Sequence, residues 1–359
     1  MPPNLNDVLG RVLPAPENHL SAEKLELARK ARRSFMGKAL AMGAGAVASG
    51  TAATRAVAAE GEEAILKLPT HTTGLGQGVA TEGYGKPSQW ETNLQRRQSP
   101  GLTRVPQASV SFTPLQGLFG IITPSGLHFE RHHQGWWDID PSKHRLMVNG
   151  LVKRERVFTM DDLMRLPSVS RIHFIECGAN SAPEWGNVAL PAVQYTHGMV
   201  SCCEFTGVLL STLLEMCGYD KKNGKYVLAE GADGSSMTRT IDIDRAMDDC
   251  IVAWAMNGEM LRPENGYPLR LVVPGVQGVS WVKYLRRLEV GDQKWAAKDE
   301  AIHYIDHMPD GTHRQYTGIQ ECKSVITTPS GSQTLLDKGY YNVTGLAWSG
   351  RGTVKRVDV

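Results

Sequence analysis

The sequence predicts an α+β fold, in which short helices are inserted among mixed strands. Two segments, residues 144–152 and 250–261, contain apolar strand-like runs and an Asn-Gly pair, which is the pattern of β-hairpins. Short helical patterns lie between the strand-like segments, at residues 159–167 and 242–249. Short helices among mixed strands are typical of an α+β domain, which we place from roughly residue 100 to 325.

The first half of this domain follows a simple order of elements. Residues 144–152 form a strand that ends in an Asn149-Gly150 turn, and residues 159–167 form a short helix that starts at a threonine cap and stops at a proline. Residues 171–177 form a buried strand. Residues 206–220 have leucines near helical spacing and predict an amphipathic helix.

The second half returns mostly to strands. Residues 226–234 form a strand that enters a glycine turn, and after the short helix the segment 250–261 forms a hairpin around Asn257-Gly258. Residues 267–275 and 279–290 are strands, the first interrupted by a proline. The segment 342–359 predicts two antiparallel strands joined by a glycine turn. Because an unpaired edge is a liability, we expect partner strands from another subunit or from a longer form of the chain.

The N-terminus has the pattern of an export signal. Arg32 and Arg33 precede an apolar run rich in alanine and glycine, and the small residues at 56–58 fit a cleavage site. The alternative is a basic helix start followed by a buried alanine-rich helix, which glycines within the run would weaken. We expect residues 1–58 to be a twin-arginine signal that delivers the folded protein to the periplasm, followed by an extended arm at residues 59–115 with little regular structure.

Composition excludes several classes of protein. A formal net charge of +2 gives no basic footprint for nucleic acid. The apolar run near the N-terminus is too short and too weakly apolar for a stable membrane span, so the chain is not expected to be membrane-embedded. Six cysteines among 359 residues do not make a disulfide scaffold, although single pairs remain open in an oxidising compartment.

Cys177 has a distinctive place, because a buried strand ends at it and the turn sequence Gly-Ala-Asn-Ser follows. A buried inert cysteine is the default interpretation. A nucleophilic thiol would need a base, for which His173 is a candidate. A zinc site would need cysteine or histidine partners at short spacing, and this segment has none. A single thiolate ligand to a soft metal is the further option, because a rigid strand end lets the next loop wrap a bound group.

Polar clusters elsewhere favour a bound anion. In residues 129–133, Phe-Glu-Arg-His-His, Arg131 can fork an oxyanion and the histidines can donate to phosphate, whereas the alternative is a solvated polar loop. Arg270 heads an apolar strand, so it needs an anionic partner or a structural salt bridge. Lys283 and Asp233 have ordinary alternatives, a lysine that reaches the surface and a turn former.

Three ordered motifs resemble the sulfite oxidase family of molybdenum enzymes. They are Phe-Glu-Arg-His-His at 129–133, Cys-Gly-Ala-Asn at 177–180, and Gly-Tyr-Pro-Leu-Arg-Leu-Val-Val-Pro-Gly at 266–275 with a Val-Lys pair after it. The resemblance covers roughly residues 120–345. It implies a sulfite oxidase-type molybdopterin-binding catalytic domain at residues 116–325. Residues 326–359 would be the incomplete start of an immunoglobulin-like β-sandwich dimerisation domain.

The resemblance also implies a cofactor and its ligands. Cys177 would be the thiolate ligand of a molybdenum ion carried by molybdopterin and would act in catalysis together with Arg131, which would face the substrate oxyanion. Tyr304 would be the active-site tyrosine, although its spacing from Trp295 is longer than usual. The residues implied to hold the pterin and its phosphate are Phe129, Glu130, Arg131, His132, His133, Asp233, Asn265, Arg270, Trp281, Val282 and Lys283.

Departures from the family pattern narrow the expected activity. Sulfite-oxidising members commonly have an arginine pair after the Cys-x-x-Asn motif, where this chain has Ser181 and Ala182, and Asn265 stands where the family has histidine. Within the family, the chain is similar to the sulfane dehydrogenase catalytic subunits of the bacterial thiosulfate-oxidising (Sox) system. We therefore expect oxidation of a cysteine persulfide by oxygen transfer at molybdenum. The alternatives are a periplasmic sulfite dehydrogenase, a metal-free module that binds a sulfur carrier, and a cysteine hydrolase.

The implied partners follow from the same resemblance. The chain has no Cys-x-x-Cys-His motif, so a separate c-type cytochrome is expected to accept the electrons. A sulfur-carrier protein would bring the substrate. A full-length family member would form a homodimer, and this chain is expected to dimerise poorly because it holds only the start of the dimerisation domain. No nucleic-acid partner is expected.

Overall fold

The computed structural model describes residues 68–76, 78, 91, 93–98, 105–185, 191–302, 304–315, 318–331 and 333–359. The expected twin-arginine signal at residues 1–58 and part of the expected arm at 59–115 lie outside these residues. Among the helices that are described, none combines the length and the apolar character needed to cross a bilayer.

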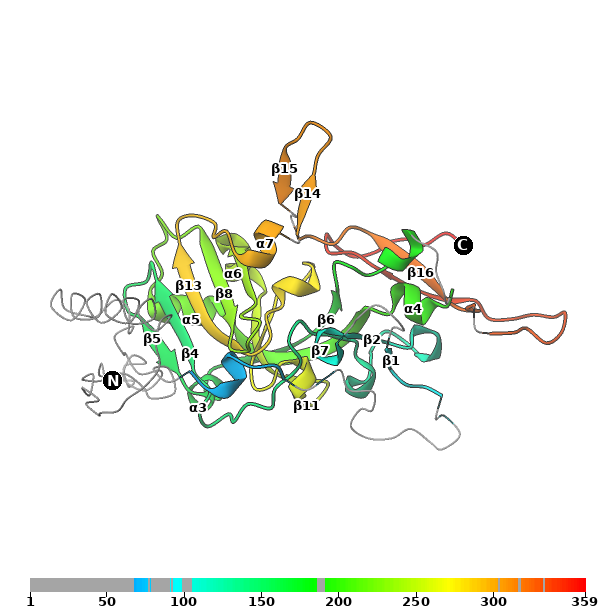
Figure 1. Cartoon of the computed structure of the whole chain (residues 1–359), viewed down its shortest axis with the longest axis horizontal. Helices are drawn as coiled ribbons and strands as arrows, with labels where there is room; N and C mark the ends of the chain where they lie inside the picture. The colour runs from blue at the N-terminus through cyan, green and yellow to red at the C-terminus, as the bar shows by residue number, and fades with distance from the viewer. Residues whose placement is uncertain are drawn as a thin grey trace, which may run out of the picture.

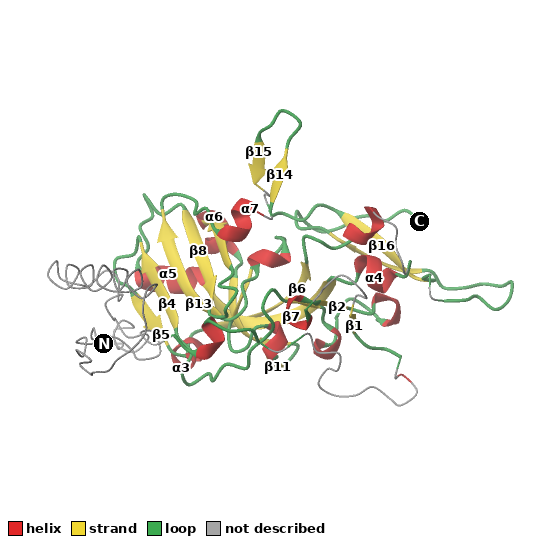
Figure 2. Ribbon diagram, viewed as in Figure 1, coloured by secondary structure: helices red, strands yellow, loops and turns green. Residues whose placement is uncertain are grey.

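The first layer is a five-stranded mixed sheet in the order β5-β4-β13-β8-β9 (Figures 1 and 2). All its pairs are antiparallel except β13 with β4, which is parallel. Short helices contact its strands, with α5 against β4 and α6 against β8 and β9. The elements are β4 (Leu146–Gly150), β5 (Arg156–Phe158), α3 (Met160–Met164), α5 (Leu210–Cys217), β8 (Tyr226–Gly231), β9 (Thr238–Asp242), α6 (Ile243–Asp248) and β13 (Leu285–Gly291).

The second sheet crosses the middle of the molecule in the order β11-β10-β7-β6, and β12 also pairs with β10 (Figure 2). Its strands are β6 (Ser168–Glu176), β7 (Val200–Leu209), β10 (Ile251–Met256), β11 (Glu259–Met260) and β12 (Arg270–Val272). The two sheets share one hydrophobic core, in which Phe205 and Trp281 meet edge to face with ring centroids 5.4 Å apart. The site described below lies where this core ends.

Smaller elements complete the described chain. A three-stranded sheet, β1-β2-β3, precedes the main sheets, and two separate hairpins follow them, β14–β15 and β16–β17. Figure 1 shows β14–β15 projecting from the body and β16 beside α4. The elements are β1 (Arg97–Gln98), β2 (Val110–Phe112), β3 (Glu130–Arg131), α4 (Val193–His197), α7 (Lys298–Ile302), β14 (Ile305–His307), β15 (His313–Gln315), β16 (Lys323–Thr328) and β17 (Thr344–Trp348).

Several predicted elements are confirmed with changed boundaries. Strands β4 and β5 form the predicted hairpin, but Asn149 and Gly150 end strand β4 and the turn follows them. Gly150 has φ 89°, and an added Cβ there would lie 2.3 Å from the carbonyl oxygen of Val290 on β13, so glycine is required by close packing. The predicted helix 159–167 is α3, and Thr159 with Asp162 forms a capping box at its start.

Other predicted elements were wrong in part. The amphipathic helix expected at 206–220 is only α5, because residues up to Leu209 pair with Ile251 and its neighbours in the sheet. The strand expected to be buried at 171–177 is exposed over its first half. The arm contributes β1 and β2 to a sheet with β3, so its described part is more regular than expected.

The predicted hairpin within residues 342–359 is also wrong. Only β17 forms there, and it pairs antiparallel with β16, which lies earlier in the chain. Residues 349–359 contain no strand. Cross-strand pairs such as Val325 with Leu346 supply the apolar contact that the sequence pattern had assigned to a partner within the same segment.

Candidate functional site

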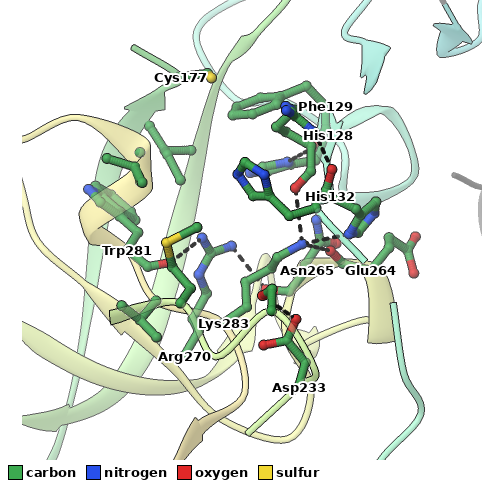
Figure 3. Close-up of a pocket in the computed structure, with 18 of the residues that line it drawn as sticks. His128, Phe129, His132, Cys177, Asp233, Glu264, Asn265, Arg270, Trp281 and Lys283 are labelled. Carbon is green, nitrogen blue, oxygen red and sulfur yellow. Dashed lines mark hydrogen bonds between the residues drawn. The ribbon is translucent and has the colours of Figure 1, made fainter. Parts of the chain in front are cut away.

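One pocket collects nearly all the residues that the sequence singled out. It holds about 780 Å³ of empty space, its open mouth included. Every sequence-derived site residue lines it except Glu130, which lies behind the wall. Figure 3 shows Cys177 at one end of the pocket, far from Asp233, and Lys283 and Arg270 in between.

Cys177 is placed by the end of strand β6. Its backbone N–H donates to the carbonyl of Met199 at 3.0 Å, and its carbonyl accepts from the backbone N–H of Asn180 at 2.9 Å, which closes a tight turn. The thiol is free and partly buried. Burial raises the pKa of Cys177, whereas the backbone amide of Ala179 and the charge of Arg131 lower it.

His173, the base predicted for a nucleophilic Cys177, does not take part in this arrangement. His173 lies on β6, opposite Cys203 on β7, and does not line the pocket. Its Nε2 atom is buried without a hydrogen-bond partner, so this atom does not accept the proton of Cys177. Within the described residues, the geometry therefore gives no support to a cysteine hydrolase.

Arg270 is a buried cation held by neutral groups. It begins strand β12 and is 3% exposed. Its Nη1 donates to the carbonyl of Asn265 at 3.0 Å and its Nη2 to that of Trp281 at 3.2 Å, whereas Nε has no partner. No described carboxylate lies within 4 Å, so the salt bridge considered from sequence does not form. Burial lowers the pKa of Arg270 to about 10, and a bound anion would relieve that cost.

Lys283 points toward the same space from the segment before β13. Its Nζ donates to the carbonyls of Arg131 at 3.3 Å and Glu264 at 3.2 Å, and to Nδ1 of His132 at 2.8 Å. These three acceptors are uncharged if His132 is neutral. Burial, followed by the charge of Arg270, lowers the pKa of Lys283 to about 8. The snorkelling interpretation is wrong, since the ammonium is turned inward.

A chain of hydrogen bonds fixes the protonation state of His132. Burial, and then the charge of Lys283, lowers the pKa of His132 well below its usual range, so the ring is neutral. Because an ammonium can only donate, Nδ1 of His132 accepts from Lys283, and the proton sits on Nε2. Nε2 donates to Oε2 of Glu130 at 2.9 Å, and the other oxygen of Glu130 pairs with the buried Arg96. The Glu130 carboxylate therefore does not line the pocket. It holds His132, which does line it, through the hydrogen bond to Nε2.

Sequence reasoning missed two buried residues at this wall. His128 stacks on Phe129, with ring centroids 5.0 Å apart, and donates from Nδ1 to the Phe129 carbonyl at 2.7 Å. Burial lowers the pKa of His128 to about 3, and its Nε2 has no partner. Glu264 is also buried, 3.6 Å from Arg96. His128 directly precedes the predicted site residue Phe129, and Glu264 directly precedes Asn265. This adjacency is the sequence feature that could have predicted them as site residues.

Two further residues complete the pocket, Asp233 from the first sheet and Tyr304 from the segment between α7 and β14. Asp233 lies in the turn after β8, and its carboxylate accepts from the hydroxyl of Ser235 at 2.6 Å. Tyr304 follows α7, and the guanidinium of Arg239 lies 5.1 Å from its ring centroid. The structure therefore brings Tyr304 to the pocket despite its unusual spacing in the sequence.

These residues fit a molybdopterin cofactor. Arg131, Arg270 and Lys283 have no carboxylate within 4 Å among the described residues, and the unpartnered Arg270 Nε adds a free donor, which suits a phosphate. Cys177 offers one soft donor in the same pocket, close enough to Arg131 for that charge to lower its pKa. The described part of the chain contains no group of three His, Cys, Asp or Glu able to hold a metal ion. A metal at Cys177 would therefore take its further ligands from outside these described side chains.

Comparisons with known proteins agree with this fit. Residues 133–298 match the oxidoreductase molybdopterin binding domain. The crystal structure of the sulfane dehydrogenase SoxCD from Paracoccus pantotrophus is similar, with a TM-score of 0.72 and 45% identity, over 75% of this chain and 69% of that chain.

Nitrate reductases are more distant relatives. An NADH-dependent enzyme from Brassica napus is 33% identical over 67% of this chain, and an NADPH-dependent enzyme from Phytophthora infestans is 33% identical over 50% of it. The chain spans only 30% and 21% of the length of these two relatives. The matched domain and the similar structure show that the chain belongs to the sulfite oxidase family of molybdopterin-binding oxidoreductases, whose cofactor is Mo-molybdopterin.

Proposed function

We propose that this chain is the catalytic subunit of a periplasmic sulfane dehydrogenase. It would oxidise the outer sulfur of a cysteine persulfide on a carrier protein and pass the electrons to a c-type cytochrome. The observation that supports this most directly is the 45% identity to the sulfane dehydrogenase SoxCD over 75% of the chain.

The loop after Cys177 favours a tethered persulfide over free sulfite. Ser181 and Ala182 occupy the positions of the family's arginine pair, and the nearby Glu184 pairs with His197 at 3.7 Å. The described residues of this loop therefore carry no arginine or lysine. A site with less positive charge attracts the sulfite dianion less, since the attraction depends on the summed charge of the site.

The proposed first step balances with water as the oxygen source. A persulfide anion and one water give the oxygenated anion, two protons and two electrons: R–S–S⁻ + H₂O → R–S–SO⁻ + 2H⁺ + 2e⁻. When bound, the molybdenum cofactor supplies the oxygen transfer and holds the two electrons. The cytochrome is the oxidant that removes them one at a time.

The side chains of this chain have distinct roles in that scheme. Arg270 and Lys283 would bind the phosphate of the cofactor, and Cys177 would supply the protein thiolate. Because burial raises the pKa of Cys177, metal binding must displace its proton. Arg131, a half-buried residue of the pocket lining, would orient the oxidised sulfur group by charge, and Tyr304, another lining residue, would hydrogen-bond it.

We would test this proposal by comparing two substrates, a carrier-bound cysteine persulfide and sulfite. The protein would be expressed in a host that makes the cofactor. We expect reduction of cytochrome c with a carrier-bound cysteine persulfide and at least tenfold lower kcat/KM with sulfite. Sulfite as the better substrate would overturn the sulfane assignment and favour the sulfite dehydrogenase alternative.

A single substitution sharpens this comparison. Ala182→Arg restores one cation without straining the backbone, whereas Ser181 has φ 66° and disfavours a larger side chain. We expect Ala182→Arg to raise kcat/KM for sulfite about tenfold, equivalent to one favourable charge interaction. The exposed Ala347→Arg on β17 serves as the control and should leave both substrates unaffected.

A further inference from the structure

The carboxylate of Glu176 joins the C-terminal hairpin to the turn that carries Cys177. Glu176 is the last residue of β6 and is 1% exposed. Its Oε1 accepts from Nζ of Lys323 on β16 at 2.7 Å, and its Oε2 accepts from Nε1 of Trp348 on β17 at 2.7 Å. Gln320, just before β16, donates from Nε2 to the Glu176 carbonyl at 3.3 Å. Both strands of the hairpin therefore reach the residue next to Cys177.

The same carboxylate fixes the turn itself through Asn180. Nδ2 of Asn180 donates to Oε1 of Glu176 at 2.9 Å, and Oδ1 of Asn180 accepts from the backbone N–H of Met199 at 3.1 Å. The backbone N–H of Asn180 closes the turn onto the Cys177 carbonyl at 2.9 Å. The backbone N–H of Cys177 donates to the carbonyl of Met199 at 3.0 Å, so both backbone polar groups of Cys177 are fixed either by Asn180 itself or by a residue that Asn180 bonds. The backbone that carries the sulfur thus depends on groups that Glu176 holds.

The hairpin end of this network is anchored by packing. The Trp348 indole is 7% exposed and belongs to a small core with Leu115, Val193 and Val200. A buried carboxylate is a costly way to join strands, since apolar residues of similar volume often do so with equal or greater stability. Three side chains, Lys323, Trp348 and Asn180, donate hydrogen bonds to Glu176. Hydrogen bonds constrain orientation more than apolar contacts do, so we infer that Glu176 fixes the orientation of the turn at Cys177.

We propose that Glu176, Lys323 and Trp348 form a positioning site for the Cys177 thiolate, so that hairpin β16–β17 sets the orientation of the metal ligand. This proposal rests on the assignment of Cys177 as the protein ligand, within the proposed function. Partners that orient a metal ligand typically change affinity or activity by about 10- to 100-fold when removed. None of the three residues touches the pocket, so each acts through Cys177.

Three variants separate positioning from general stability. Trp348→Phe removes the indole N–H and keeps an aromatic ring in the core. Glu176→Gln keeps the shape but has one acceptor oxygen in place of two, so it cannot accept from all three donors as the carboxylate does. The control is Thr327→Val, which removes the 2.9 Å hydrogen bond between Thr327 and Thr344 in the same hairpin and does not reach Glu176. Urea unfolding identifies any variant that fails to fold, and Lys323→Met then replaces it.

Two readouts avoid dependence on substrate. In apoprotein from a host without pterin synthesis, the alkylation rate of Cys177 at one fixed pH, followed by peptide mass spectrometry, should change at least threefold in Trp348→Phe and Glu176→Gln. In loaded protein reduced by dithionite, the Mo(V) electron paramagnetic resonance signal should shift in the same variants and stay unchanged in Thr327→Val. Unchanged alkylation and an unchanged signal in folded Trp348→Phe and Glu176→Gln would overturn the proposal.

Failure of this proposal is distinguishable from failure of the proposed function. Neither readout uses persulfide or cytochrome, so both stay valid if the substrate is sulfite. If Cys177 is not the metal ligand, Cys177→Ser will show the wild-type Mo(V) signal. That result would overturn the positioning proposal for a reason separate from the Glu176 network.

Discussion

At the scale of single residues, the site contains two inward-facing cations, Arg270 and Lys283, that have no carboxylate within 4 Å among the described residues. Arg270 and Lys283 are held by carbonyl oxygens and a neutral imidazole, and the carboxylate of Glu130 faces Arg96 and His132 instead of the pocket. An anionic group bound in the pocket would therefore be attracted by the positive charges of Arg270 and Lys283.

Glu130→Gln tests the support behind this wall. The substitution removes the nearer carboxylate of the buried Arg96, which keeps only the Glu264 carboxylate at 3.6 Å, and lets an amide N–H face Nε2 of His132. We expect the free energy of unfolding of the apoprotein to fall by about 3–5 kcal/mol, the cost of breaking a buried ion pair. Urea unfolding measures it. The matched control is Glu321→Gln, which breaks the exposed pair with Arg351 and should leave stability unchanged. Equal effects for the two variants would contradict the role of Glu130.

Lys283 should make anion binding depend on pH. Its pKa of about 8 means that the ammonium is lost above that pH, and the affinity of the apoprotein for an anion falls with it. We expect binding of inorganic sulfate, whose charge is constant in this range, to be about tenfold weaker at pH 9 than at pH 7 by calorimetry. Lys283→Arg should bind equally at both pH values. A flat profile for the wild type would show that Lys283 does not contact the anion.

The same pKa has a consequence for stability, with a definite sign. The folded-state pKa of about 8 is below the ordinary value of 10.5, so the unfolded chain binds more protons between these values. The contribution of Lys283 to the stability of the apoprotein therefore rises as pH increases through that window. Bound anion should remove this effect, because it favours the charged lysine.

At the scale of elements, the two Asn-Gly pairs show when a local sequence signal is enough to predict the position of a turn. Both Asn-Gly pairs predicted turns, and only the one at Asn257 forms between its strands, with φ 52° at Asn257 and 77° at Gly258. At Gly150 the pair instead ends a strand, because the backbone of β13 lies against it. Local sequence indicates positive φ in both cases, but the packing that decides the turn comes from distant residues.

Asn257 is expected to hold more than its own hairpin. Its side chain accepts from the backbone N–H of Glu204 at 3.0 Å and donates to the carbonyl of Thr123 at 2.8 Å, which ties the segment leading to β3 onto the central sheet. We expect Asn257→Ala to lower the free energy of unfolding by about 1–3 kcal/mol, the cost of lost hydrogen bonds and of positive φ.

A second variant at this position separates the two causes. Asn257→Gly keeps the backbone conformation at little cost and loses only the side-chain bonds, so its effect should be smaller than that of Asn257→Ala. Chemical unfolding of both variants gives the comparison. Equal losses would mean that backbone strain contributes nothing there.

At the scale of the whole molecule, the pocket unites motifs that are far apart in the sequence. The motifs at residues 129–133 and 266–275 contain strands β3 and β12, and the motif at 177–180 follows strand β6. Strand β10 lies between β12 and β7 in the central sheet and pairs with both. Motif order predicted the family, the cofactor and the pocket residues. The β10–β11 hairpin and helices α3 and α6 were also predictable, because their signals are local. The β4–β5 hairpin forms as predicted, but its turn lies after the Asn-Gly pair that predicted it.

Other features could not be predicted because they depend on distant contacts. The inward turn of Lys283 requires His132, and the pairing of β17 with β16 joins segments separated by a long loop. The network around Glu176 likewise depends on Trp348, far along the chain. Periodicity and spacing within a segment carry no signal for such pairs.

The measurement that tests the central claim most directly is X-ray absorption at the molybdenum edge, on loaded wild type and on Cys177→Ser. It counts the sulfur atoms bound to the metal and needs no substrate. We expect one sulfur neighbour fewer in Cys177→Ser, and the wild-type count in the control Cys202→Ser, whose thiol is outside the pocket. An unchanged sulfur count in Cys177→Ser, or a folded wild type that contains no molybdenum in a host that makes the cofactor, would contradict the assignment of Cys177 as the metal ligand.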